Sequence, residues 1–76
     1  MPRQYRFRDV ERVLLARGFR HISQVGSHVK FRKTGKQTLT VIVPKKQRSI
    51  PIGTFRSILR QAAMTVQVFE QVLNDR

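Results

Sequence analysis

The hydrophobic and polar positions of this chain change their period several times, and each change predicts a new element. Residues 8–17 carry apolar side chains at helical spacing, so this segment predicts an α-helix. Gly18 and Phe19 follow it as the left-handed glycine and the hydrophobic residue of a Schellman ending, with Phe19 folded back on Leu14. The chain is therefore expected to begin with a helix that ends sharply.

From residue 20 to residue 32 the period becomes two, which is typical of β-strands. Gly26 and Ser27 interrupt this segment as the Gly-X pair that a type II′ turn prefers, so the pattern predicts a β-hairpin. With these two residues as the loop, the register is fixed. The opposing pairs are then Val25 with His28, Ser23 with Lys30, Ile22 with Phe31, and His21 with Arg32.

The two faces of this hairpin differ in polarity, because successive side chains of a strand point to opposite faces. One face carries Ile22, Val29 and Phe31. The other carries His21, Ser23, His28, Lys30 and Arg32. We therefore expect the first face to be core and the second to be open.

A third strand is predicted over residues 38–43, where Leu39, Val41 and Val43 alternate with polar or exposed positions and Pro44 ends the strand. Residues 33–36 form the turn that precedes it. Residues 45–48 form a basic loop after it.

The strongest helical pattern covers residues 55–62, where apolar side chains recur at i, i+3, i+4 and i+7. Gly53 or Thr54 is expected to cap this helix, and Arg56 lies on its exposed side. A short final helix from Thr65 is expected to pack on the same core and to cover an edge of the sheet.

The order of these elements predicts the fold class. A helix, a three-stranded antiparallel sheet, a helix and a short C-terminal helix indicate an α+β fold, in one domain spanning residues 1–76. A chain this short buries only about 60% of the surface of its unfolded form, which leaves no room for a second core. In this class the helices cover one sheet face, so the face with His28 should be free to meet a ligand.

Charge identifies the kind of partner. Sixteen Lys and Arg against four Asp and Glu give a formal net charge of +12, which predicts that the partner is a polyanion. The basic residues recur from Arg3 to Arg76, and this spread favours nucleic acid over a membrane surface. Residues 1–6 lack the apolar run of a signal peptide, and the chain has no cysteine, so we expect a cytoplasmic protein.

The residue types present favour metal-free cleavage of RNA. The acidic residues are too dispersed for a carboxylate pair or a magnesium site: Asp9, Glu11, Glu70 and Asp75. RNA supplies its own nucleophile, the 2′-hydroxyl, so a proton-transfer group and cations suffice, without metal or small-molecule cofactor. His28 can transfer the proton, since the ordinary imidazole pKa of about 6.5 lies near working pH. His21 would lie about 13 Å from it, too far to serve the same phosphate.

Basic residues near His28 are the candidate binding groups. The predicted RNA-binding residues are Lys30, Arg32, Lys45, Lys46, Arg48 and Arg56. Three of them, Lys45, Lys46 and Arg48, belong to the basic loop. This loop precedes a helix N-terminus, a position suited to binding phosphate. Gly26 and Ser27 would fix the position of His28 at the turn.

Several short motifs occur together in a fixed order: Gly18-Phe19, Gly26-Ser27-His28, the VIVP of residues 41–44 and the GTFRSILRQA of residues 53–62. Together they resemble the HicA (YcfA-like) family of mRNA interferase toxins over nearly the whole chain. The resemblance implies a double-stranded-RNA-binding-like fold, ribonuclease activity against mRNA, a catalytic histidine at His28, and a HicB-like antitoxin that binds and blocks the toxin.

Two positions depart from the family pattern. Many relatives carry a second histidine after the proline of the third strand, where this chain has Lys45 and Lys46, so the general acid is not identified. The helix ends at Ala62, Ala63 and Met64, where relatives often have glycine. Two other functions stay open: a non-catalytic module that docks on structured RNA, and, with less support because helix-turn-helix spacing is missing, a DNA-binding protein.

Overall fold

The computed structural model describes residues 4–46 and 48–75. Its elements are α1 (Phe7–Ala16), β1 (Arg20–Val25), β2 (His28–Lys33), β3 (Leu39–Pro44), α2 (Ile52–Gln61) and α3 (Val66–Asn74). The strands form an antiparallel sheet in the order β1-β2-β3. The predicted α+β fold is therefore confirmed. None of the helices in the described ranges is long and apolar enough to span a membrane.

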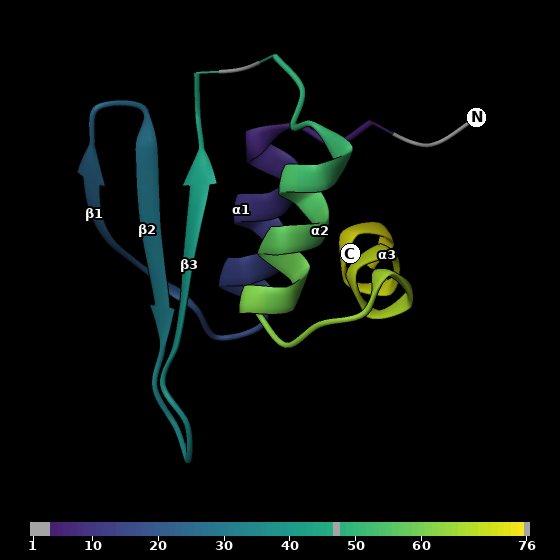
Figure 1. Ribbon diagram of the computed structural model, residues 1–76. Coiled ribbons are helices and arrows are strands. Elements are labelled where there is room, and N and C mark those ends of the chain that lie inside the picture. The colour runs from purple at the N-terminus through teal and green to yellow at the C-terminus, as the bar shows by residue number, and fades with distance from the viewer. Residues whose placement is uncertain (1–3, 47, 76) are drawn as a thin grey trace.

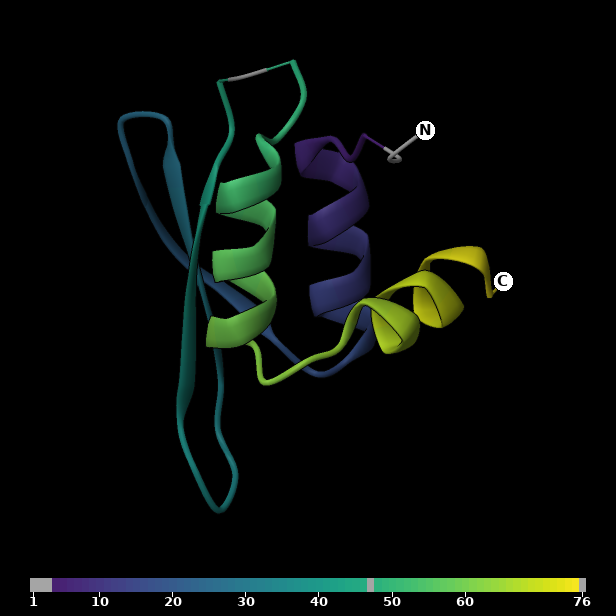
Figure 2. The same ribbon diagram turned by 45° about the vertical axis from the view of Figure 1, so that its right-hand side comes forward.

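The three helices of the described ranges lie on one side of the sheet (Figure 1). α1 and α2 run beside each other against the sheet, and no element of the described residues covers the other face (Figure 2). α3 packs against α1 on the side away from the sheet. The expectation that this helix covers a sheet edge is therefore wrong, because its apolar residues Phe69 and Leu73 join the core between the helices.

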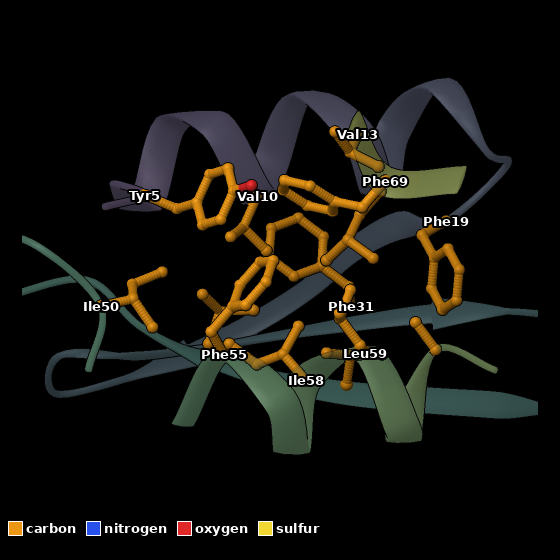
Figure 3. Packing of buried hydrophobic residues seen from close by; sticks show 14 of the residues in the cluster. Tyr5, Val10, Val13, Phe19, Phe31, Ile50, Phe55, Ile58, Leu59 and Phe69 are labelled. Carbon is orange, nitrogen blue, oxygen red and sulfur yellow. The ribbon is translucent and has the colours of Figure 1, made fainter. Parts of the chain in front are cut away.

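An apolar core fills the space between the sheet and the helices (Figure 3). Phe31 of β2 is fully buried in it, together with Val29 and the inward-facing residues of β3. Three rings meet at its helical side: the Tyr5 and Phe55 rings stack with centroids 4.3 Å apart, and Phe69 meets both edge-on. This burial joins α1, β2, β3, α2 and α3 into one packed body, and β1 is attached to it by pairing with β2.

Tyr5 is a core residue that the sequence pattern does not reveal. It pairs with Ile50 in an isolated bridge, in which the Ile50 N–H donates to the Tyr5 carbonyl at 2.8 Å. This bridge ties the segment before α1 to the loop before α2. α1 then begins at Phe7, where the Asp9 carboxylate accepts the Arg6 N–H at 2.9 Å.

Both long helices end in Schellman motifs. At the end of α1, Gly18 has a φ of +94° and the Phe19 N–H donates to the Leu14 carbonyl at 2.9 Å, as predicted. At the end of α2 the left-handed position is held by Ala63, with a φ of +54°. There the Met64 N–H donates to the carbonyl of the helix residue five positions earlier, at 2.9 Å.

The start of α2 differs from the expectation. The helix begins at Ile52 after Pro51, so Gly53 and Thr54 lie inside it and neither caps it. The φ of −57° at Pro51 is fixed by its ring, which prepares the chain for a helix without a side-chain cap. The final helix, predicted to start from Thr65, begins at Val66, and Thr65 caps it, since its Oγ1 accepts the Val68 N–H at 3.1 Å.

The hairpin register is confirmed near the turn and wrong beyond it. Val25 opposes His28 and Ser23 opposes Lys30, but an irregularity at Ile22 then inserts one extra residue in β1. As a result, Phe31 faces His21 instead of Ile22, and Arg32 faces Arg20 instead of His21. This is the pairing of a β-bulge, and its location on an edge strand is typical.

Candidate functional site

The sheet face that the helices leave uncovered is called the outer face here. It carries Arg20, Ile22, Ser23 and Val25 from β1, His28, Lys30 and Arg32 from β2, and Thr40, Ile42 and Pro44 from β3. The alternation of β2 explains this division, because Val29 and Phe31 occupy the intervening positions and are buried. The predicted open face of β2 is therefore present.

His28 is the first residue of β2 and follows the turn directly. Gly26 has a positive φ of +59°, whereas the φ of Ser27 is not positive, as in the predicted type II′ turn. The Ser27 carbonyl accepts the Lys45 N–H at 2.7 Å, and Gln24 Nε2 donates to the Gly26 carbonyl at 3.0 Å. These bonds, one from β1 and one from the residue after β3, hold the turn, so the exposed imidazole is attached to a hydrogen-bonded backbone.

A row of basic side chains extends from His28 along the central strand. Lys30 and Arg32 follow it on the outer face at intervals of about 7 Å, the separation of alternate strand residues. Both are half-buried, and Arg32 Nε approaches the Thr40 hydroxyl at 3.5 Å. The three described strands contain no Asp or Glu, and the acidic residues belong to α1, α3 and the residue after α3. The imidazole therefore lies in a positive field.

The other predicted RNA-binding residues are spread around the edge of this face. The Lys45 ammonium lies 5.5 Å from the centroid of the Phe7 ring of α1, which places it on the helix side of the sheet. Lys46 and Arg48 are exposed in the loop after β3, at the same end of the sheet as the hairpin turn (Figure 1). Arg56 is exposed on α2, also on the helix side. Only Lys30 and Arg32 of the predicted set share the outer face with His28.

His21 does not lie on the outer face, contrary to the expectation. Because of the extra residue at Ile22, His21 opposes Phe31, and the two rings meet edge-on with centroids 5.7 Å apart. Residues that oppose each other in a sheet share a face, so His21 belongs to the helix side. The two histidines are thus separated by the sheet as well as by distance along it.

Gln61 is a residue near this face that the sequence pattern missed. Its Oε1 accepts the N–H of Ile42 on the edge strand β3 at 3.1 Å, and its Nε2 donates to Ser57 Oγ at 3.1 Å. The glutamine is part of the motif at residues 53–62, but helical periodicity alone does not indicate that it reaches a strand. The glutamine therefore supplies a hydrogen-bond acceptor for the backbone N–H of Ile42 at the edge of the sheet.

Arg20 and Ile22 also belong to the outer face and were missed. Ile22 was expected in the core but is 44% exposed, and the bulge places it beside Arg20 and Arg32. A bulge has no residue signature strong enough to locate it in this strand from sequence alone. The outer face is therefore more basic and more apolar than predicted.

Comparison with known proteins adds one finding. A family profile described as HicA toxin of bacterial toxin-antitoxin matches residues 7–64, which run from the first residue of α1 to just beyond α2. No curated protein shows significant similarity to the chain. The matched region contains the turn, all three strands and the row that begins at His28.

Proposed function

The chain belongs to the HicA toxin family of bacterial toxin-antitoxin systems, and we propose that it is a metal-independent endoribonuclease that cleaves mRNA with His28. Membership of such a system implies an antitoxin partner, for which we propose a HicB-like protein in a type II system. The domain would span residues 1–76. The observation that carries the nuclease proposal is the row of His28, Lys30 and Arg32 on the uncovered sheet face.

The proposed reaction uses the substrate's own nucleophile. His28 removes the proton of a ribose 2′-hydroxyl, whose oxygen attacks the adjacent phosphorus and expels the 5′-oxygen of the next nucleotide. The products are a 2′,3′-cyclic phosphate and a free 5′-hydroxyl. Lys30 stabilises the negative charge that develops on the phosphoryl oxygens, and Arg32 holds the RNA backbone farther along the strand. Lys46 and Arg48 then hold the flanking backbone at the same end of the sheet.

The protonated imidazole of His28 is also the proposed donor to the leaving oxygen. His21 lies on the other side of the sheet, and the Lys45 ammonium rests against Phe7. These placements support a single-histidine mechanism, in which one imidazole takes the proton and returns it. The hydrogen-bonded turn supports it further, because proton transfer requires a defined distance to the substrate.

Cleavage of RNA in EDTA tests the proposal. We expect His28→Ala to lower the cleavage rate by about 10²- to 10⁴-fold, the usual value of a proton-transfer group. His21→Ala is the matched control and should cleave at nearly the wild-type rate, since its ring lies on the opposite side of the sheet. Mass spectrometry of the products should detect the cyclic phosphate. Equal cleavage by the wild type and His28→Ala would refute the assignment.

A non-catalytic RNA-binding module is the other candidate, supported by the same basic face. It predicts that the wild type binds RNA in EDTA and leaves it intact. Expression in cells separates the two functions independently. A nuclease toxin should arrest growth, His28→Ala should not, and co-production of the antitoxin should restore growth.

A further inference from the structure

The bulge in β1 places two like charges opposite each other in the sheet. Arg20 and Arg32 oppose each other directly across the two strands, and both belong to the outer face. Two like charges in directly opposing positions of a sheet reduce its stability. The acidic residues lie on the helix side, so no carboxylate of the sheet neutralises this pair.

The same two arginines line a hollow of about 480 Å³ at the end of the sheet away from the hairpin turn. Its other lining residues are Gly18, Ile22 and Thr34. The lining thus combines two guanidinium groups with the exposed apolar side chain of Ile22, which is 44% exposed, and it contains no carboxylate. Two guanidinium forks beside an apolar surface are suited to a phosphodiester and its attached nucleoside.

We propose that Arg20, Ile22 and Arg32 form a second RNA subsite, which holds a backbone phosphate of the substrate remote from the cleaved bond, with the adjoining nucleoside against Ile22. This proposal rests on the proposed ribonuclease function. Arg32 lies four residues after His28 on one strand, so the subsite is about 13 Å from the imidazole. It therefore engages RNA that extends beyond the scissile dinucleotide.

The position of the hollow favours RNA over an acidic protein segment. His28, Lys30 and Arg32 follow one another along β2 at intervals of about 7 Å, a spacing that successive phosphates of an extended strand can follow. The subsite continues this row without interruption. An acidic segment of a partner protein would need the arginines but not their alignment with the imidazole.

The test measures RNA binding in a His28→Ala background and RNA cleavage in the wild-type background. Arg20→Gln is the test variant, and Arg12→Gln is the control, since it removes the same charge from α1, where Arg12 contacts the Asp75 carbonyl. We expect Arg20→Gln to weaken binding of a long single-stranded oligoribonucleotide by about tenfold, as for one charged contact. The salt slope of log affinity should decrease by about 0.7.

Substrate length gives a readout that a purely structural role would not change. Arg20→Gln should slow cleavage of the long oligonucleotide at subsaturating concentration but leave a ribodinucleotide unaffected. Its melting temperature should be equal to or above that of the parent, because the variant removes the like-charge pair. Arg12→Gln should change RNA affinity less than twofold.

The outcomes separate the two proposals. The subsite is refuted if Arg20→Gln binds the long RNA as tightly as its parent, even if it weakens binding of the antitoxin instead. It is also refuted if cleavage of the dinucleotide decreases equally. If neither the wild type nor His28→Ala cleaves RNA, the nuclease proposal fails, while the binding comparison still decides whether the subsite exists.

Discussion

The covered face and the outer face of the sheet are made from alternate residues of the same strands. On the covered face of β2, the side chains of Val29 and Phe31 are only 1% and 0% exposed. On its outer face, His28 is exposed and Lys30 is half-buried. The covered face contributes burial, and the outer face contributes charge and an imidazole. A strand of six residues can thus keep stability and chemistry apart, because its side-chain period of two assigns neighbours to different environments.

The largest effect is expected for a substitution on the covered face, and it concerns stability. Phe31→Ala should lower the free energy of unfolding by about 3–5 kcal/mol, because it removes a fully buried ring and leaves a cavity. Urea denaturation followed by circular dichroism measures the change. Val25→Ala is the control, since this outer-face side chain is 78% exposed and its truncation should change stability by less than about 0.5 kcal/mol. Similar losses in both variants would contradict the division of the faces.

The next effect concerns the outer face. Lys30→Gln should lower kcat/KM for RNA cleavage by about tenfold, or about 1.4 kcal/mol, because it removes a cation from the row beside His28. Its stability in urea should stay near that of the wild type. A variant that loses activity only in proportion to its loss of folded protein would indicate that Lys30 is structural, and the comparison of the two faces would then not hold at this position.

The sequence predicted β2 and its two faces correctly because this central strand is packed on one side and open on the other. Its neighbour β1 is an edge strand in which all six residues are exposed or half-buried. Weak burial imposes little pattern on the sequence. The period of two therefore predicted Ile22 in the core, although the bulge turns it outward. The same bulge moved His21 to the helix side.

The geometry of the candidate site was predictable to the extent that it follows from a local turn and strand period. His28, Lys30 and Arg32 are placed by Gly26, Ser27 and the alternation of β2. The positions of Lys45 and Arg56 depend on how the loop and α2 pack on the sheet, which involves contacts distant in sequence. Such contacts leave no periodic signal, and the side of the sheet on which these two cations lie could not be predicted.

The boundary between the two faces can be tested at Gln61. Gln61→Leu should lower stability by about 1 kcal/mol, because the N–H of Ile42 loses its acceptor and the hydrogen bond to Ser57 is lost. Hydrogen exchange followed by NMR should show faster exchange at the Ile42 amide. Gln67→Leu, an exposed glutamine substitution on α3, is the control and should leave that amide unchanged. Unchanged exchange in Gln61→Leu would mean that the bond does not protect this edge.

The smallest effect lies away from both faces, at the end of α2. Ala63 holds a φ of +54°, a left-handed conformation that costs an alanine about 1–2 kcal/mol and a glycine little. Glycine loses more entropy on folding, by about 0.5–1 kcal/mol, so Ala63→Gly should stabilise the protein by a net value of about 0.5 kcal/mol.

Thermal unfolding of Ala63→Gly and of Ala16→Gly compares the same substitution in two backbone conformations. Ala16 is the last residue of α1 and has no positive φ, so its replacement should lower the melting temperature, while that of Ala63 should raise it. Because neither residue lies on the outer face, both variants should cleave RNA at the wild-type rate when fully folded. A decrease in melting temperature for Ala63→Gly would mean that the left-handed position carries no strain, and a change in cleavage would mean that the outer face depends on the helix layer behind it.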